Sequence, residues 1–442
     1  MIPQAFLENY GMILAIVLFA LTYVLMLIFG KIRPYIALGS AVLFIATGML
    51  PLGEIGGAID WNVILMIAGT MGLVALFVES KMPELLADLI MERCPNIMWA
   101  AVSLSLFAGI ISAFVDNVAT VLMIAPVAME ICKKLKTNPV PFIIAIAVSS
   151  NLQGAATLVG DTTAIMLGSA LDMSFLDFFW YRGRPGMFFV VEAGAVLSAL
   201  ILMLLLRKEK APIPKAKSRT KVTDYVPSFL LVALLALLIG ASFIQNKPDV
   251  TNGAICCALM VVGLIYSWIK NKTFKAVIEP VKTIDYETIL LLLGLFLMIG
   301  GISAMGVIDW LADLLVQAGG GNLFLMYTVI VWASVVISAF IDNIPYVATM
   351  IPVIGSISVV MAAQMGVDPA QVAVPLYFGL LSGATLGGNC TPIGASANIT
   401  GIGILRKEGY TVKNGDFFKI GIPFTLAAIV PAYIIIWLFF GV

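Results

Sequence analysis

The 442-residue sequence contains no histidine, and only 11% of its residues are charged. The missing histidine excludes the Ser-His-Asp and Cys-His arrangements of nucleophilic enzymes, and it leaves proton handling to carboxylates, lysines, tyrosines or water. No two of the five cysteines stand at metal-ligand spacing, so they predict neither a disulfide framework nor a metal site. The net charge is zero and no basic run is interleaved with aromatic residues, so nothing indicates nucleic-acid binding.

Apolar residues make up 61% of the chain, and the mean hydropathy is +1.07. Soluble domains carry about twice this share of charged residues, so lipid must surround most of the protein. The first apolar run lacks the cleavage site of a secretory signal, and we expect it to be retained as a span. Ten stretches of spanning length are predicted near residues 11–30, 35–52, 60–79, 140–170, 187–206, 227–245, 252–269, 285–305, 370–405 and 419–440.

Two further apolar stretches, 97–132 and 322–360, are each interrupted by an Asp-Asn pair. This pattern predicts a re-entrant helical hairpin whose tip stops inside the membrane. Such a tip is tolerated only where it lines protein or a wet cavity. We therefore expect both tips to face the interior of the molecule.

The distribution of Lys and Arg predicts the orientation, because cytoplasmic loops collect basic residues. With the N-terminus outside, 22 of the 25 basic residues fall in cytoplasmic loops, including Lys31 and Arg33 after the first span. Only Arg182, Arg184 and Lys247 are then left outside. Both termini are therefore predicted outside, the central linker in the cytoplasm, and the protein in the inner membrane of a bacterial or archaeal cell.

The chain also matches itself. Residues 111–127 and 337–353 share nine of seventeen residues, and nearly the same offset aligns Asp60 with Asp285 and Gly69 with Gly294. Ordered matches at one offset indicate an internal repeat. With five crossings in each half, an odd number, the second copy must enter the membrane from the opposite side.

The predicted fold is an all-α polytopic membrane protein built from two inverted repeats. Each repeat has five transmembrane segments, one of them broken, and one re-entrant hairpin. The first repeat covers 1–206, with its hairpin at about 97–132 and its broken helix at about 140–170. A cytoplasmic linker, 207–225, leads to the second repeat, 226–442, with its hairpin at about 322–360 and its broken helix at about 370–405. Amphipathic segments at 82–91 and 307–316 are expected to be helical.

The hairpin tips and the Gly/Thr/Asn-rich breaks of two helices are the candidate binding site. At a break, unpaired carbonyls suit a cation, whereas unpaired N–H groups suit an anion or an oxyacid. Glycines in the breaks let a small ligand approach the backbone. The predicted substrate- and ion-binding residues are Asp116, Asn117, Asn151, Gly154, Thr157, Gly160, Asp161, Thr162, Asp342, Asn343, Gly388, Asn389, Thr391, Gly394, Ser396 and Asn398.

Carboxylates inside a bilayer are costly unless they are paired, so Asp116, Asp161 and Asp342 need a reason to be there. One interpretation is ion coupling, with sodium bound by the Asp-Asn pairs of the two tips. The other is that each aspartate only caps a helix. For Asp161 both interpretations stay open, because Ala395 stands at the matching position of the second half. Asn343 is also expected to cap the helix that follows it.

These tips and breaks resemble the ion transporter superfamily, and within it the ArsB/NhaD group of arsenite permeases, sodium/proton antiporters, silicon effluxers and the melanosomal P protein. The likeness covers nearly the whole chain, and residues 342–353 and 387–398 look most like the P protein and silicon-efflux branch. The resemblance implies a homodimer in which a mobile domain, carrying both hairpins and both broken helices, moves as an elevator against a scaffold. In relatives these tips and breaks form the sodium and substrate sites.

The sequence departs from the dicarboxylate branch of that superfamily, whose hairpin tips carry Ser-Asn-Thr where this chain has aspartate. Extra carboxylates would repel a dianion. We therefore expect a secondary transporter and not an enzyme, a proton- or sodium-coupled efflux permease for a small inorganic solute such as arsenite, antimonite or silicate. Sodium/proton antiport, sodium-coupled symport of a dicarboxylate or sulfate, and an ion channel are the alternatives. No cofactor is expected apart from sodium ions.

Overall fold

The computed structural model describes residues 4–212 and 219–441, and within them nearly all regular structure is helical. The helices of the first half are α1 (Gln4–Ile28), α2 (Arg33–Thr47), α3 (Ile55–Ala58), α4 (Trp61–Glu79), α5 (Met82–Met91), α6 (Ile97–Ser112), α7 (Asn117–Leu135), α8 (Val140–Gly154), α9 (Thr162–Ala170) and α10 (Met187–Leu205). Those of the second half are α11 (Val226–Ala241), α12 (Thr251–Asn271), α13 (Lys275–Lys282), α14 (Tyr286–Ala304), α15 (Val307–Ala318), α16 (Leu323–Ser338), α17 (Asn343–Met365), α18 (Pro369–Gly387), α19 (Ser396–Lys407) and α20 (Asn414–Phe440). Short 3-10 turns η1 (Gly30–Ile32), η2 (Leu52–Glu54), η3 (Leu176–Phe178) and η4 (Gly388–Cys390) complete the list, with one ribbon, β1 (Trp180–Tyr181) and β2 (Arg184–Pro185).

Every predicted span and hairpin arm is helical. In the described residues, eight helices are long and apolar enough to cross a membrane, or nine if α15 and α16, bent by 114°, form one span. Both predicted breaks occur, between α8 and α9 and between α18 and α19, and both predicted amphipathic segments form helices, α5 and α15. The chain is thus a multi-pass membrane protein.

Several details differ from the prediction. The stretches 35–52 and 227–245 form helices of only 15 and 16 residues, α2 and α11, which fall short of the expected spanning length. Conversely, α17 has 23 residues and is long enough to span, although it was predicted as half of a hairpin. The fold also contains the ribbon β1–β2, where the all-α prediction expected none. Part of the predicted linker, 213–218, lies outside the described residues.

Corresponding residues cap corresponding helices in the two halves. The side chains of Asn96 and Asn322 each accept a hydrogen bond from the backbone N–H three residues later, at the starts of α6 and α16. Asp60 and Asp285 do the same for α4 and α14. Such a side chain satisfies a backbone donor that the first turn of a helix leaves unpaired. The matched sequence positions therefore mark helix starts in both halves.

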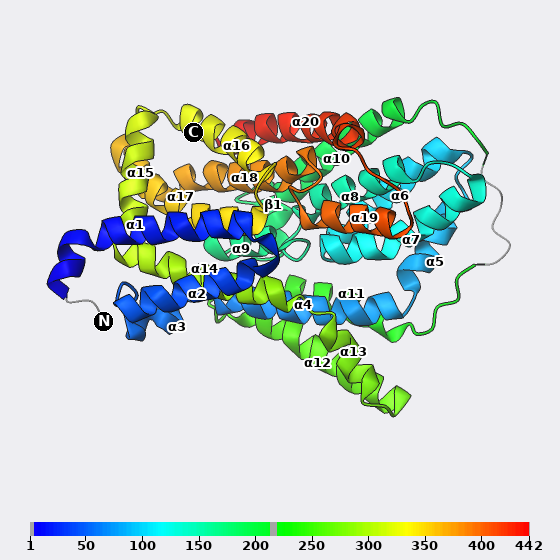
Figure 1. Cartoon of the computed structure of the whole chain (residues 1–442), viewed down its shortest axis with the longest axis horizontal. Coiled ribbons are helices and arrows are strands. Elements are labelled where there is room, and N and C mark those ends of the chain that lie inside the picture. The colour runs from blue at the N-terminus through cyan, green and yellow to red at the C-terminus, as the bar shows by residue number, and fades with distance from the viewer. Residues whose placement is uncertain (1–3, 213–218, 442) are drawn as a thin grey trace.

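The helices form two groups. The central bundle consists of α6–α10 and α16–α20, packed around α8 and α18. Every residue of α8 except Pro141 is buried, as is every residue of α18 from Val372 onward. The flanking bundle consists of α1, α2, α4, α11, α12 and α14, and it meets the central bundle at α9 and α17. Figure 1 shows the flanking bundle along the lower side of the molecule and the central bundle above it.

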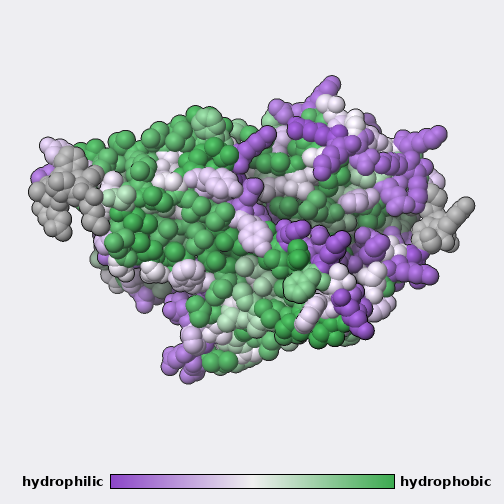
Figure 2. All heavy atoms as spheres, turned by 60° about the horizontal axis from the view of Figure 1, so that its bottom comes forward, coloured by the Kyte–Doolittle hydropathy of each residue, from purple (hydrophilic) through white to green (hydrophobic). Residues whose placement is uncertain are grey.

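The surface separates apolar from polar side chains along the length of the molecule. Figure 2 shows broad hydrophobic surface over the middle and left, whereas hydrophilic side chains gather toward the right. Large apolar side chains are exposed on the helices that face outward, among them Leu21 of α1, Phe229 of α11 and Leu438 of α20. In Figure 1, α1 begins and α20 ends toward the left, while α10 ends toward the right. An apolar belt of this kind is what lipid requires.

Two helix pairs of the flanking bundle cross at glycines. The helix α4 packs along α12, and α2 packs along α14. At Gly69 of α4, an added Cβ would lie 2.5 Å from the backbone of Cys256 and Cys257. At Gly294 of α14, it would lie 2.6 Å from the carbonyl carbon of Ala37. Both crossings need glycine, because a side chain would keep the two backbones apart.

Replacing Gly69 with alanine is expected to weaken the α4–α12 crossing, since the new methyl group would overlap backbone atoms that cannot rotate away. The expected cost is about 1–3 kcal/mol, which would appear as a lower melting temperature of the detergent-purified protein. Gly39 of α2 is the matched control, because nothing lies within 4 Å of its Cβ position. Equal melting temperatures for Gly69→Ala and Gly39→Ala would contradict the close crossing.

Candidate functional site

The two predicted hairpin tips each end at an aspartate that caps the second arm. Asp116 accepts hydrogen bonds from the backbone N–H groups of Val118 and Ala119, at 3.0 and 3.1 Å, and so starts α7. Asp342 accepts one from Ile344, at 3.4 Å, and starts α17. The expectation that Asn343 caps α17 is therefore wrong, because the carboxylate one residue earlier takes that place. The cap leaves the side chain of Asn343 available for other contacts.

The breaks in α8–α9 and α18–α19 pack against the hairpin tips in the same way. An added Cβ at Gly160 would lie 2.5 Å from the carbonyl oxygen of Gly154 and 2.8 Å from that of Ser112. At Gly394 the corresponding contacts are Gly388, at 2.6 Å, and Ser338, at 2.9 Å. Each break thus lies directly on the backbone of a hairpin. These close approaches require glycine at both positions.

One threonine in each break forms a hydrogen bond with the backbone of the neighbouring hairpin. The hydroxyl of Thr157 donates to the carbonyl of Ala113, and the hydroxyl of Thr391 donates to the carbonyl of Ala339. Both threonines are buried. The carbonyls that they bind are freed where α6 and α16 end, so these hydrogen bonds satisfy acceptors that a helix end leaves unpaired. A hydrogen bond therefore fixes each hairpin tip to the break that packs against it.

Four asparagines from both halves form one buried amide network. Asn151 accepts from the Nδ2 of Asn117 at 2.9 Å, and its own Nδ2 donates to Asn389 at 2.9 Å and to Asn398 at 3.1 Å. Asn398 in turn donates to the carbonyls of Gly388 and Thr391, both at 3.0 Å. All four side chains are at most 6% exposed. Asn151 is the residue that joins the first hairpin to the second break.

A second set of contacts joins the first break to the second hairpin. The carboxylate of Asp161 accepts from the hydroxyl of Thr163 at 2.8 Å and from the Nδ2 of Asn343 at 3.3 Å. Thr163 lies 3.3 Å from the hydroxyl of Thr385 on α18. Asp161 stands at the N-cap position of α9, yet its side chain makes no capping hydrogen bond there. Its partners are instead the hydroxyl of Thr163, in the first turn of α9, and the amide of Asn343 from the second hairpin.

The three site aspartates differ in their partners. Asp342 forms an ion pair with Arg33 at the start of α2, and the hydroxyl of Ser396 lies 3.5 Å from the same oxygen. In the described part of the chain, no ion pair is formed by Asp116 or Asp161. Asp116 and Asp161 instead line one small cavity against α4, with a volume of about 10 Å³. That volume is close to the space that a single water molecule needs.

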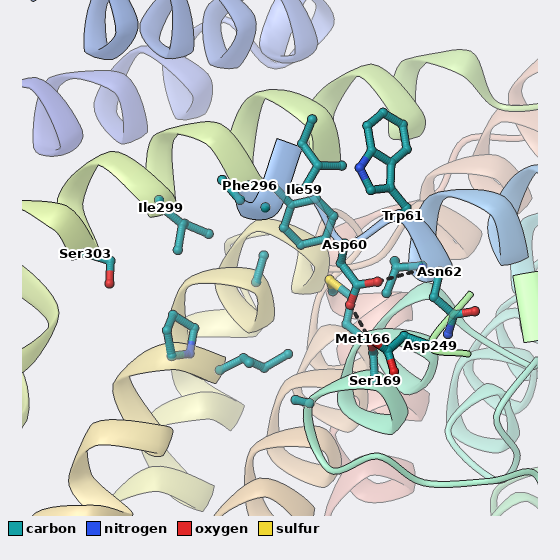
Figure 3. A pocket seen from close by; sticks show the side chains of 18 of the residues that line it. Ile59, Asp60, Trp61, Asn62, Met166, Ser169, Asp249, Phe296, Ile299 and Ser303 are labelled. Atoms are coloured by element: carbon teal, nitrogen blue, oxygen red, sulfur yellow. Dashed lines mark hydrogen bonds between the residues drawn. The ribbon is translucent and has the colours of Figure 1, made fainter. Parts of the chain in front are cut away.

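A larger cavity of about 580 Å³ lies between the two bundles. It is lined by the end of α3, the start of α4, the end of α9, the two residues that precede α12, and parts of α14 and α17. Figure 3 shows Asp60, Ser169 and Asp249 together at one end, and Ile299 and Ser303 of α14 at the other. Asp60 accepts a hydrogen bond from Ser169, so α4 and α9 are joined at the rim.

The structure brings most of the predicted site residues together. The amide network and the Asp161 contacts include the side chains of Asn117, Asn151, Asp161, Asn343, Asn389 and Asn398, and Thr157 and Thr391 hold the breaks. Thr162 lines the small cavity with Asp116, and Gly154, Gly160, Gly388 and Gly394 contribute backbone. Ser396 is peripheral, with one long contact to Asp342.

Two contributors, Arg33 and Thr385, were not predicted, and Thr163 was predicted only as part of the first break. Arg33 was assigned to a cytoplasmic loop, but it reaches the tip of the second hairpin. Thr163 follows the predicted Thr162 directly, and Thr385 occupies the position that matches Asn151 when the two breaks are aligned. That alignment was the signal that could have identified Thr385. The described residues contain no group of three Cys, Asp or Glu side chains arranged to hold a metal ion.

Comparison with known proteins gives a consistent set of relatives. The family model described as citrate transporter, CitMHS, matches residues 23–379. An uncharacterized transporter of Mycobacterium tuberculosis is 30% identical over 431 residues, covering 96% of this chain and 98% of the relative. The human P protein is 27% identical over 448 residues, covering 83% of this chain and 52% of the P protein.

Two solved structures have a similar fold. The YdaH transporter of Alcanivorax borkumensis aligns with a TM-score of 0.60 and 14% identity, over 90% of this chain and 88% of that one. MtrF of Neisseria gonorrhoeae, described as one of a class of antimetabolite efflux pumps, aligns with a TM-score of 0.54 and 14% identity, over 89% and 83%. At this level of identity the likeness concerns the fold alone.

Proposed function

The chain belongs to the citrate transporter (CitMHS) family of secondary transporters, and from this premise we propose that it is a proton- or sodium-coupled efflux permease for a small, uncharged inorganic solute such as arsenite, antimonite or silicate. The observation that carries the proposal is the convergence of two hairpin tips and two broken helices, where Asp161 accepts from the buried amide of Asn343 and shares a small cavity with Asp116, and where Asp342 directly precedes Asn343. Carboxylates at this depth are the expected sites for a coupling cation.

The partners of the carboxylates favour cation binding. The Asp-Asn pairs at 116–117 and 342–343 supply carboxylate and amide oxygens, which are hard ligands suited to sodium. Asp116 and Asp161 line the same small cavity, so a single cation there would lie close to two negative charges. One cation bound at this position would offset the cost of holding both carboxylates ionised away from water.

The composition of the site favours an uncharged solute. Most of its side chains are amides and hydroxyls. Among the described residues, Arg33 is the basic residue that forms an ion pair with a site carboxylate. A free dianion would meet a surplus of negative charge. A small hydroxylated molecule such as arsenous acid, by contrast, would be held by amide, hydroxyl and backbone groups. The citrate in the family description is thus disfavoured as a free trianion.

The two halves act as inverted repeats in this proposal. Three matched features support it. They are the helix caps at Asp60 and Asp285, the helix crossings at Gly69 and Gly294, and the hydrogen bonds from Thr157 and Thr391 to the hairpin backbones. Repeats of this kind place the substrate between them and allow alternating access. The proposed domain boundaries are 1–206 and 226–442, joined by the polar linker 207–225.

Transport proceeds by an elevator motion in which the central bundle moves against the flanking bundle. The cavity between the bundles supports this view, because it leaves open space at the interface along which they would move. The apolar faces of α11 and α12, with Phe229 71% exposed and Ile269 64% exposed, are where a second protomer or lipid would pack. A homodimer in a cell inner membrane, with both chain ends outside, completes the proposal.

Flux into proteoliposomes tests the function. We expect efflux or uptake of arsenite, antimonite or silicate to be stimulated by an imposed pH or sodium gradient and to saturate with the cation. Citrate and sulfate serve as comparison solutes in the same vesicles. Transport of citrate but of no uncharged solute would replace the proposal with anion symport, and flux indifferent to both gradients would contradict cation coupling.

Sodium/proton exchange is the second candidate, because the carboxylates that bind the cation need no further solute for it. A pH-sensitive dye inside the same vesicles distinguishes the two. Sodium-driven alkalinisation or acidification without any solute would identify the protein as an exchanger. Unitary current steps in a planar bilayer would instead indicate a channel and rule out both transport hypotheses.

A further inference from the structure

The ion pair between Arg33 and Asp342 connects the two bundles at the site itself. Arg33 begins α2 of the flanking bundle, and Asp342 is the tip residue of the α16–α17 hairpin in the central bundle. The side chains are 27% and 13% exposed, so both charges are largely withdrawn from solvent. Beside them, the hydroxyl of Tyr23 on α1 donates to the carbonyl of Pro345 at 2.7 Å. The end of α1 and the start of α2 therefore lie against this tip.

Among the described residues, the ion pair between Arg33 and Asp342 has no counterpart at the matching positions of the other half. The glycine crossings relate Ala37 of α2 to Cys256 of α12, and Arg33 precedes Ala37 by four residues, as Asn252 precedes Cys256. The position matching Arg33 thus carries no charge. Asp116, which corresponds to Asp342, likewise has no ion pair among the described residues. Because the same helix crossing forms without a basic residue, the architecture does not require Arg33.

We propose that Arg33 is a tethered counter-ion that occupies Asp342 when no coupling cation is bound, so that the cation must displace it. This inference rests on the proposed cation coupling and adds a residue that sets its affinity. A guanidinium at Asp342 compensates its charge, and the bound pair also ties the flanking bundle to the hairpin tip. When a cation takes the carboxylate, the tie is released and the central bundle is free to move.

The physical reason is competition for one carboxylate. A partly buried aspartate without a partner is costly, so it holds whichever cation is available. A side chain fixed to the same protein is always present, and it therefore raises the concentration of free cation needed to replace it. Lysine would keep the charge but lose the planar fork that matches a carboxylate. Glutamine would remove the competitor and leave a neutral donor of similar length.

The test measures the cation concentration that half-saturates transport in proteoliposomes, with sodium as the probe, or protons if sodium does not stimulate the wild type. Arg33→Gln is expected to lower that concentration by about tenfold, equivalent to about 1.4 kcal/mol of lost competition. Arg33→Lys should lower it by less than Arg33→Gln does, because lysine keeps the charge but loses the planar fork. Lys31→Gln is the matched control, since it removes an exposed basic residue two positions earlier in η1.

The outcomes separate this inference from the function on which it rests. If neither sodium nor protons stimulate transport by the wild-type protein, the proposed coupling is overturned before any variant is measured. If the wild type is coupled, an unchanged or higher half-saturating concentration in Arg33→Gln overturns the role of Arg33, and the pair is then only structural. If Arg33→Gln is unstable, its melting temperature in detergent is measured with the probe cation. A larger cation-induced rise than in the wild type supports competition, and an equal rise overturns it.

Discussion

Changing Asp116, Asp161 or Asp342 to asparagine is expected to lower cation-coupled transport about a hundredfold, because contacts to a charged group are worth about 1.5–3 kcal/mol. The substitution separates two roles. Asparagine caps a helix about as well as aspartate does, so α7 and α17 should keep their starts at Asn117 and Asn343. The charge, by contrast, is lost completely. Each variant should therefore fold and still fail to couple.

Asp161→Asn is the most informative of the three, because the side chain of Asp161 does not cap α9. Its carboxylate accepts from Thr163 and Asn343, and an amide there would bring its own donors toward those of Asn343. Flux and the melting temperature are measured on the same preparations, with Asp368→Asn as the control. Asp368 also caps a helix, α18, but it lies outside the site and is exposed. Undiminished coupled flux in all three site variants would leave Asp116 and Asp342 as helix caps, would leave Asp161 with a structural role only, and would contradict cation coupling at these carboxylates.

For Asp342 the two effects combine. Removing its charge leaves Arg33 without its carboxylate, so Asp342→Asn is expected to be less stable than the other two variants. A second substitution, Arg33→Gln in the same chain, should restore the melting temperature and leave coupling impaired. If the double variant regained coupled transport, the carboxylate of Asp342 would not be a cation ligand.

The sequence was sufficient to predict where most helices, the two tips and the two breaks lie, because all of these depend on local patterns. Apolar runs of spanning length set the helices, and paired Asp-Asn breaks inside two of them located the tips. The resemblance to the ion transporter superfamily is confirmed by the family match. Helix lengths were less predictable, since α2 ends at Thr47 where Gly48 takes a left-handed conformation, and hydropathy alone does not register such a stop.

Contacts between distant segments could not be predicted. Arg33 and Asp342 are 309 positions apart, and counting basic residues by loop placed Arg33 in the cytoplasm with Lys31. The amide network is equally long-range: Asn151 binds Asn389 and Asn398, whose repeat-related positions carry alanine. The internal repeat could indicate which segments correspond, but not which side chains would differ between them. The contacts that differ between the two halves come from such non-matching side chains.

The two halves have glycines at matching positions of their breaks, and replacing either one is expected to have a large effect. Gly160→Ala and Gly394→Ala should each abolish transport and destabilise the protein by about 3 kcal/mol. In both variants the new methyl group would lie within 3 Å of three backbone carbonyl oxygens, from the broken helix itself and from the neighbouring hairpin. Backbone atoms cannot rotate away, so the hairpin would have to separate from the break. That movement would also strain the hydrogen bonds of Thr157 and Thr391.

Gly403→Ala is the matched control, because Gly403 lies on α19 with nothing within 4 Å of its Cβ position. Alanine there should leave transport unchanged and stabilise the helix by about 1 kcal/mol. Melting temperature and flux for the three variants form one comparison. Equal losses at Gly160 and Gly394 are expected if two equivalent hairpin–break units build the site together. A loss at only one of them would mean that a single half carries the binding site, and a wild-type result at both would contradict the contact between hairpin and break.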